Sequence, residues 1–246
     1  MRSLLILACL VMAPVAGPAA AQQAFSLPQG CEGRVTIQKR GCTVTHLFIC
    51  TTDPQGWQRR VDFDDQGMTY AGAIDAEAQW VESWHPLAGE TETLVAGAAD
   101  PASFSDLIAT GQDTFEFHTE TRPGNYQTLF RGRDLLTGES VDIDGVTLER
   151  TEFLVIAYDE AGQEVWRTEG AEFINRDWRT FLSGVRTNTT SEGRWDADTT
   201  PVEFIFPGEP GFLTTTPRAD CGVVMSQAPV RADDGAIATP TAYHRN

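Results

Sequence analysis

The chain has few basic residues, and almost none of them is lysine. Lysine and arginine together number 18 against 35 acidic residues, which gives a formal net charge of −17 at pH 7. Lys39 is the only lysine, and the arginines are scattered along the chain. Binding to nucleic acid or to an anionic membrane surface requires basic patches, so we expect neither partner. The acidity itself indicates a well-solvated surface.

The sequence also lacks the short motifs that identify common catalytic and metal sites. It contains no H-E-x-x-H, G-x-S-x-G, S-x-x-K or C-x-x-C. The four histidines are far apart in the sequence: His46, His85, His118 and His244. The acidic segments 62–67 and 142–145 resemble the start of a calcium-binding loop without its closing glutamate, and we interpret them as hairpin turns. We therefore predict no metal, no cofactor and no recognisable catalytic residue.

Long apolar runs are absent except at the start of the chain. Residues 1–21 combine one arginine, a short apolar segment and the ending Ala19-Ala20-Ala21, which predicts a signal peptide cleaved between Ala21 and Gln22. The apolar segment is too short to span a bilayer, so we expect no transmembrane segment in the mature chain. A periplasmic or secreted location follows. The alternative is a lipoprotein acylated at Cys9, because the residues before it loosely resemble a lipobox.

The four cysteines that follow the signal peptide predict two disulfide bonds, as expected for an exported chain. The sequence predicts a first hairpin with a tight turn at Arg40-Gly41. In that register Cys31 lies opposite Cys50, close enough to form a disulfide. Cys42 is then left for Cys221, which ties the end of the chain to the first hairpin.

Alternation of apolar and polar residues, interrupted by short turns, predicts a mainly β protein. The clearest part is residues 136–187, where a strand at 151–158 is followed by the turn Asp159–Gly162 and a returning strand at 163–168. The polar segment 188–200 is predicted to be a long loop. The other predicted strands are 33–39, 43–51, 57–63, 68–74, 79–84, 91–95, 114–122, 126–133, 178–185 and 202–206.

One short helix is predicted near residues 101–110, with Asp100 as its cap, Pro101 at its first position and Gly111 at its end. The expected fold is a large antiparallel sheet, either curved or forming a partly open barrel or sandwich. The expected organisation is a signal peptide at 1–21, a loosely held leader at 22–30, a single β-rich domain at 31–228 and a disordered tail at 229–246.

Aromatic residues are numerous for such a polar chain, with 6 tryptophans and 13 phenylalanines. Filling of a β core accounts for them. The functional alternative is an apolar cavity inside the curved sheet that holds a lipid-like or other hydrophobic ligand. The residues predicted to line such a cavity are Trp166, Trp178 and Tyr158.

The central segment resembles a group of known sequences. The pattern G-x-x-V-x-I-x-G-V-x-L from Gly138 to Leu148, followed by the turn Asp159–Gly162 and by E-V-W-R-T-E-G, is similar to uncharacterised exported β-rich proteins of Gram-negative bacteria. The resemblance extends at most from Cys31 to Cys221. It implies a location and an architecture, and no activity or catalytic residue.

Three functions are compatible with these features. The first is a non-catalytic exported protein of the cell envelope that binds a partner or gives structural support. The alternative is a periplasmic carrier of a hydrophobic ligand, and the second alternative is a hydrolase without a recognisable motif. The expected partner is accordingly an unknown protein or a hydrophobic small molecule. A deep apolar pocket favours the carrier, whereas a filled core favours the first function.

Overall fold

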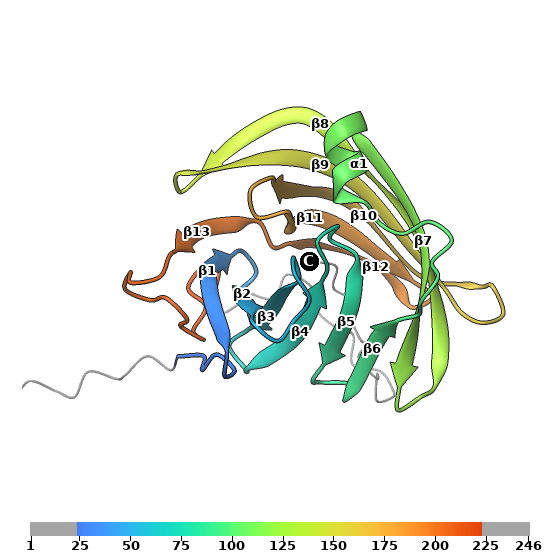
Figure 1. Ribbon diagram of the computed structural model, residues 1–246, viewed down its shortest axis with the longest axis horizontal. Helices are drawn as coiled ribbons and strands as arrows, with labels where there is room; N and C mark the ends of the chain where they lie inside the picture. The colour runs from blue at the N-terminus through green and yellow to red at the C-terminus, as the bar shows by residue number, and fades with distance from the viewer. Residues whose placement is uncertain (1–23, 223–246) are drawn as a thin grey trace, which may run out of the picture.

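The computed structural model describes residues 24–222 (Figure 1). Thirteen strands form one antiparallel sheet that is not closed, and the described chain contains a single short helix. From β1 to β12 each strand pairs with its neighbours in sequence, and β13 pairs with β1. The predicted fold class, a mainly β protein with a large curved antiparallel sheet, is confirmed.

The elements follow one another in the order β1 (Cys31–Lys39), β2 (Thr43–Cys50), β3 (Gln58–Phe63), β4 (Met68–Ile74), β5 (Trp80–His85), β6 (Glu90–Leu94), α1 (Phe104–Thr110), β7 (Gln112–Arg122), β8 (Tyr126–Ile143), β9 (Val146–Tyr158), β10 (Glu164–Asn175), β11 (Thr180–Thr190), β12 (Gly193–Asp198) and β13 (Pro201–Ile205).

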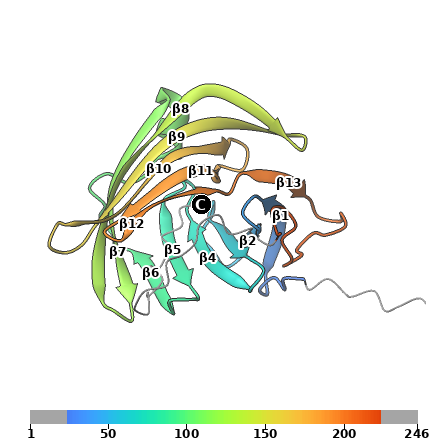
Figure 2. The same ribbon diagram turned by 180° about the vertical axis from the view of Figure 1, so that it is seen from behind.

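The sheet curls so that its long strands face its short ones. Strands β8–β11 arch over β1–β6, as the front and back views show (Figures 1 and 2). We call the enclosed side of the sheet the inner face and the other side the outer face. Because side chains alternate along a strand, each strand contributes residues to both faces.

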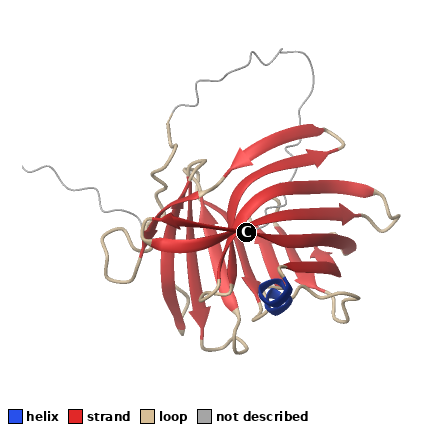
Figure 3. Cartoon of the chain, turned by 90° about the horizontal axis from the view of Figure 1, so that it is seen from above, coloured by secondary structure: helices blue, strands red, loops and turns tan. Residues whose placement is uncertain are grey.

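Buried apolar side chains form several clusters. One cluster joins β1 and β2 to β9–β11 and β13: Val35, Ile37, Leu47, Val146, Leu148, Phe173, Leu182 and Phe204. A second lies under β7–β10: Phe115, Phe117, Phe130, Phe153, Val155, Ala157 and Trp166. In a third, Phe104 and Leu107 of α1 pack with Ile74, Ala78 and Ile174. Figure 3 shows the helix end-on beside the strands.

The two ends of the sheet meet at one point of the chain. Strands β12 and β13 are separated only by Thr199 and Thr200. The N–H of Thr199 donates to the carbonyl oxygen of Gly184 in β11 (3.1 Å), whereas the carbonyl oxygen of Thr200 accepts from the N–H of Arg40, just after β1 (2.9 Å). This stretch, which we call the seam, therefore transfers its hydrogen bonding from one end of the sheet to the other.

The predicted start of the helix is wrong. Ser103 is the N-cap, and its hydroxyl accepts from the N–H of Asp106 (3.1 Å). Asp100 is held in extended conformation by an isolated bridge to Glu116, and its carboxylate accepts from the hydroxyl of Thr114 (2.7 Å). Both residue types favour N-caps, and the pairing with β7 decides between them. The predicted end at Gly111 is confirmed by its left-handed conformation, with φ 85°.

The prediction of a long loop at residues 188–200 is also wrong. Most of this segment belongs to the β11–β12 hairpin, whose register pairs Asn188 with Trp195 and Thr190 with Gly193. Threonine is favoured in strands despite its polarity, and an edge hairpin needs no apolar face toward solvent. Polarity therefore misled the prediction.

The leader is not loosely held over the residues that the structure describes. Phe25 stacks on His46 with ring centroids 5.5 Å apart, and its N–H donates to the carbonyl oxygen of Leu213 (2.7 Å). Phe25 and Leu27 also cover Phe48 and Phe63 on the outer face of the first strands. The predicted signal peptide and tail, with residues 223–228 of the predicted domain, lie outside the described part of the chain.

Candidate functional site

A group of charged side chains is buried on the inner face of the first strands. The register pairs Thr45 with Asp62, and Arg60 and Asp62 alternate with the outward Val61. Asp62 is the centre of the group. Its Oδ1 accepts from Thr45 Oγ1 (2.6 Å) and Arg60 Nε (2.8 Å), and its Oδ2 accepts from Arg60 Nη2 and lies 3.8 Å from Lys39 Nζ.

Two residues from the other end of the sheet complete the group. Arg186 of β11 donates from Nη1 to Thr199 Oγ1 at the seam (2.8 Å). The carboxylate of Glu172 in β10 attracts both Arg186 and Arg60 electrostatically and so favours their charged forms. The five residues, which we call the charge cluster, are each at most 9% exposed: Lys39, Arg60, Asp62, Glu172 and Arg186. The cluster therefore joins β1 and β3 to β10 and β11 beneath the seam.

The electrostatics of the charge cluster depend on Lys39. Burial lowers the pKa of Lys39 to about 7, and the attraction of Asp62 opposes this only in part. Burial also acts to raise the pKa of Asp62, but Arg60 and then Lys39 outweigh it and hold that pKa below its ordinary range. When Lys39 is neutral, two arginines face two carboxylates and the buried charges balance. Protonation of Lys39 adds a charge that is expensive to bury.

A row of polar side chains continues from the charge cluster across β4–β6. Arg60 lies over the ring of Tyr70 (5.5 Å to the centroid), and the Tyr70 hydroxyl is 3.0 Å from Ser83 Oγ. His85 meets Tyr70 edge-on, and its Nε2 is 3.8 Å from Glu92 Oε2.

The row contains the residue types of a nucleophilic hydrolase, but its geometry favours a structural role. The separation of His85 from Glu92 exceeds hydrogen-bonding distance. The gap beside the row, bordered by Leu47, Arg60 and Tyr70, has a volume of about 10 Å³, which is at the lower limit for a single water molecule. The hydrolase alternative stays a prediction.

The structure does not bring the three predicted lining residues together. Trp166 is buried in the aromatic cluster of the inner face. Trp178, in the turn between β10 and β11, packs against Phe204 with ring centroids 5.8 Å apart. Tyr158 follows the inward Ala157, and its ring lies beneath Arg131 (5.6 Å). Their role in binding a hydrophobic ligand stays a prediction.

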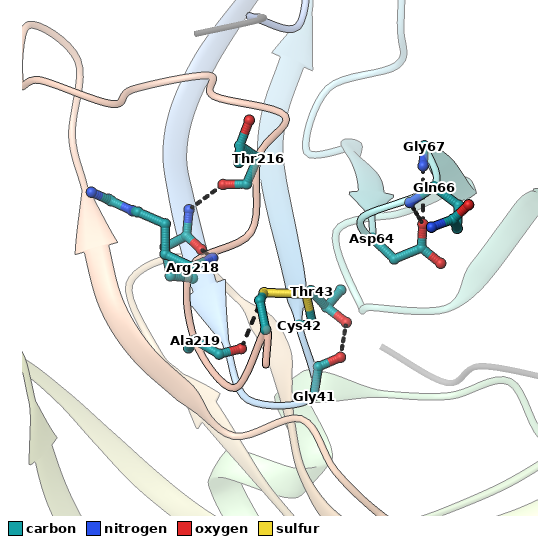
Figure 4. The surroundings of a disulfide bond; sticks show 11 residues. Gly41, Cys42, Thr43, Asp64, Gln66, Gly67, Thr216, Arg218 and Ala219 are labelled. Atoms are coloured by element: carbon teal, nitrogen blue, oxygen red, sulfur yellow. Dashed lines mark hydrogen bonds between the residues drawn. A yellow bond between two sulfur atoms is a disulfide. The ribbon is translucent and has the colours of Figure 1, made fainter. Parts of the chain in front are cut away.

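A wide groove lies beside a disulfide bond. Both predicted disulfides are present, Cys31–Cys50 and Cys42–Cys221. The second borders a groove of about 1020 Å³, together with the turn between β3 and β4 (Figure 4). In that turn Asp64 Oδ1 accepts from the N–H groups of Gln66 (2.7 Å) and Gly67 (3.0 Å), so the acidic segment is a hairpin turn as predicted. Over residues 24–222, no group of His, Cys, Asp or Glu is arranged to hold a metal ion.

A smaller hollow lies on the outer face of β2–β6. Its volume is about 340 Å³, and Phe48, Ala71 and Trp84 contribute to its lining. Trp84 is 44% exposed. The ion pairs of Arg59 with Asp53 and Glu82 lie on the same face. We call this hollow the Trp84 slot.

Sequence reasoning missed the charge cluster and the Trp84 slot. Two signals for the cluster were present: Lys39 is the only lysine, and Gln58, Arg60 and Asp62 make one whole face of a predicted strand polar. Neither signal identifies Glu172 and Arg186, which lie more than a hundred residues away in sequence. The slot has no sequence signal, because exposure of one tryptophan among six depends on the neighbouring strands.

The single helix of the described region lacks the length and apolar character needed to cross a membrane. Comparison with known protein families, curated proteins and solved structures finds no match to this chain.

Proposed function

We propose that the mature protein is a non-catalytic, exported binding protein of the cell envelope that acts through its outer surface. The observation that supports this proposal most directly is the filling of the inner face. Apolar clusters occupy it under β7–β10 and around α1, and the charge cluster occupies it beneath the seam. The groove beside the Cys42–Cys221 disulfide and the Trp84 slot, by contrast, adjoin a turn and the outer face.

The disulfides support the exported location. Two bonds formed from four cysteines are typical of proteins that fold in an oxidising compartment. The Cys42–Cys221 bond spans a sequence separation of 179 residues, and it ties the end of the described chain to the first hairpin. A rigid scaffold of this kind suits binding at a fixed surface, because little conformational entropy is lost on association.

Mass spectrometry of the protein purified from the periplasm tests the proposal. We expect a denatured mass that begins at Gln22 and is lighter by about four hydrogens than the reduced chain. The native spectrum should show no lipid-sized adduct. An adduct that disappears on denaturation would instead identify a carrier, and an acylated mass beginning at Cys9 would identify a lipoprotein.

A positive control guards against loss of a ligand during purification. Phe130 is completely buried between Phe117 and Trp80. The variant Phe130→Ala opens an apolar cavity there, and such cavities stay dry and bind small apolar molecules. A benzene adduct of this variant, absent from the unaltered protein, would show that the spectrometer retains apolar ligands.

A further inference from the structure

The Trp84 slot has a floor of small residues. In the register of β3–β5, Ala71 lies opposite Val61 on one side and Trp84 on the other, with Gly72 and Ala73 following along β4. Small side chains between Phe48 and Trp84 leave a recess in an otherwise continuous sheet surface. Strands β4, β5 and β6 are labelled along the lower part of Figure 1. The volume of about 340 Å³ is at the lower end of the range for small-molecule sites, roughly 300–1,000 Å³.

The polar rim of the slot is held in a fixed geometry. Arg59 donates from Nε and Nη2 to the two carboxylate oxygens of Asp53 (2.6 and 2.8 Å) and from Nη1 to Glu82 (2.6 Å). These hydrogen bonds, with that to Asp53 first, raise the pKa of Arg59, so the guanidinium stays charged. Its remaining N–H groups and the Glu82 carboxylate, 41% exposed, are therefore pre-oriented for a ligand.

The slot combines a flat exposed ring with fixed polar groups, and this combination selects the chemistry of a ligand. A purely apolar ligand would cover Arg59 and Glu82 without hydrogen-bonding them, which costs free energy. An anionic ligand would be repelled by the net charge of −17 and by a rim in which two carboxylates surround one arginine. A neutral ligand with one apolar face and several hydroxyl groups avoids both costs, because it forms hydrogen bonds with the rim and is not repelled by the negative charge.

We propose that the Trp84 slot binds an uncharged saccharide. One face of a sugar ring packs on the indole of Trp84, over the floor formed by Ala71 and Gly72. Its hydroxyl groups accept from Arg59 and donate to Glu82. This inference rests on the proposed function, since it names the surface and the ligand class through which the exported protein acts.

Calorimetric titration of the full mature chain with neutral oligosaccharides tests the inference. Chitotriose, maltotriose and cellotriose serve as probes, up to about 10 mM, because a site for one or two rings gives affinities near the millimolar range. We expect at least one of them to bind. The variant Trp84→Ala should weaken that binding at least tenfold, and Trp84→Phe, which keeps an aromatic face, should weaken it less.

The chain offers a matched control for the tryptophan variants. Trp195 in β12 is exposed to a similar extent, 37%, but lies at the far end of the strand order. Trp195→Ala should leave saccharide binding within twofold of the unaltered protein. The melting temperature of each variant is measured in parallel, so that a loss caused by unfolding is recognised.

Several outcomes would overturn the inference. They are the absence of binding by all three probes, equal losses in Trp84→Ala and Trp195→Ala, and tighter binding of trigalacturonate or of an arginine tripeptide than of any neutral probe. Failure of the proposed function is distinguished by the mass spectrum. A lipid adduct refutes that function, whereas a bare native mass without saccharide binding refutes the slot's ligand alone.

Discussion

Two regions of the inner face are equally buried and differ in chemistry. Under β7–β10 the side chains are aromatic, with Phe117 and Phe130 stacked at 5.4 Å and Trp80 packed edge-on against both. Beneath the seam they are charged, with Asp62 between Lys39 and Arg60. The aromatic region is stabilised by burial of area, which tolerates a change of shape. The charge cluster depends on each partner, because removing one charge leaves the others uncompensated.

The difference follows from the position of each region in the sheet. The aromatic region lies under the β7–β8 ladder, which runs through ten residue pairs without a register shift. At the seam, hydrogen bonding passes from β11 to β1 through Thr199 and Thr200. Directional interactions matter most where the ladder is interrupted, since apolar contacts alone would allow β1 and β11 to slide. We therefore expect the charge cluster to fix how the two ends of the sheet meet.

The largest effect is expected from Asp62→Asn. The substitution keeps the shape of the side chain and removes the negative charge at the centre of the cluster. Arg60 and Lys39 are then buried with a single carboxylate, Glu172, to compensate them and Arg186. The free energy of unfolding should fall by about 3–5 kcal/mol, as for other broken buried ion pairs. Urea denaturation monitored by tryptophan fluorescence measures the loss.

Asp65→Asn is the control for this comparison. Asp65 lies three residues away, in the exposed turn between β3 and β4. Its substitution should change stability by less than about 0.5 kcal/mol. The double variant Asp62→Asn with Lys39→Met should recover part of the loss, because it removes a buried amine that no longer has a carboxylate beside it. A loss below about 1 kcal/mol for Asp62→Asn would show that the cluster contributes no more than a surface pair.

These contrasting regions were not equally visible in the sequence. Strand positions, the first hairpin and both disulfides follow from local alternation, turn residues and the register of a single hairpin, as Cys31 opposite Cys50 illustrates. The aromatic alternation of Phe115 and Phe117 likewise indicates a buried strand face. The charge cluster is assembled from four strands that are distant in sequence, so its composition depends on the curl of the whole sheet. The exposure of Trp84 could not be predicted for the same reason, because it depends on how the neighbouring strands are arranged.

The second effect is a dependence of stability on pH. The pKa of Lys39 is about 7 in the folded protein and 10.5 in its ordinary state. Between these values the unfolded chain binds a proton that the folded chain does not, so stability rises with pH. The cost of the buried charge is present in full below pH 7 and is relieved as the pH approaches 10.5. Relative to Lys39→Met, the unaltered protein should gain up to about 5 kcal/mol over this window, because each unit of difference between the two pKa values corresponds to about 1.4 kcal/mol.

Urea denaturation of both proteins at several pH values across this window measures the gain. Most other titrating groups are common to the two proteins and largely cancel in the difference. Asp62 affects the pH dependence of stability outside this window. Because its pKa is lowered, the stabilisation by its negative charge is lost only in acid. Parallel stability curves for the two proteins would contradict a buried amine that loses its proton near neutral pH.

The smallest effect is expected in the aromatic region, from Phe130→Leu. Phe130 is completely buried. Leucine is also apolar and only moderately smaller, so Phe117 and Trp80 can repack around it. The free energy of unfolding should fall by about 1–1.5 kcal/mol, well below the loss for Asp62→Asn. Phe206→Leu, at a residue 36% exposed, is the control and should change stability by less than about 0.5 kcal/mol. If Phe130→Leu were as damaging as Asp62→Asn, shape would matter as much as charge on the inner face, and the contrast between the two regions would fail.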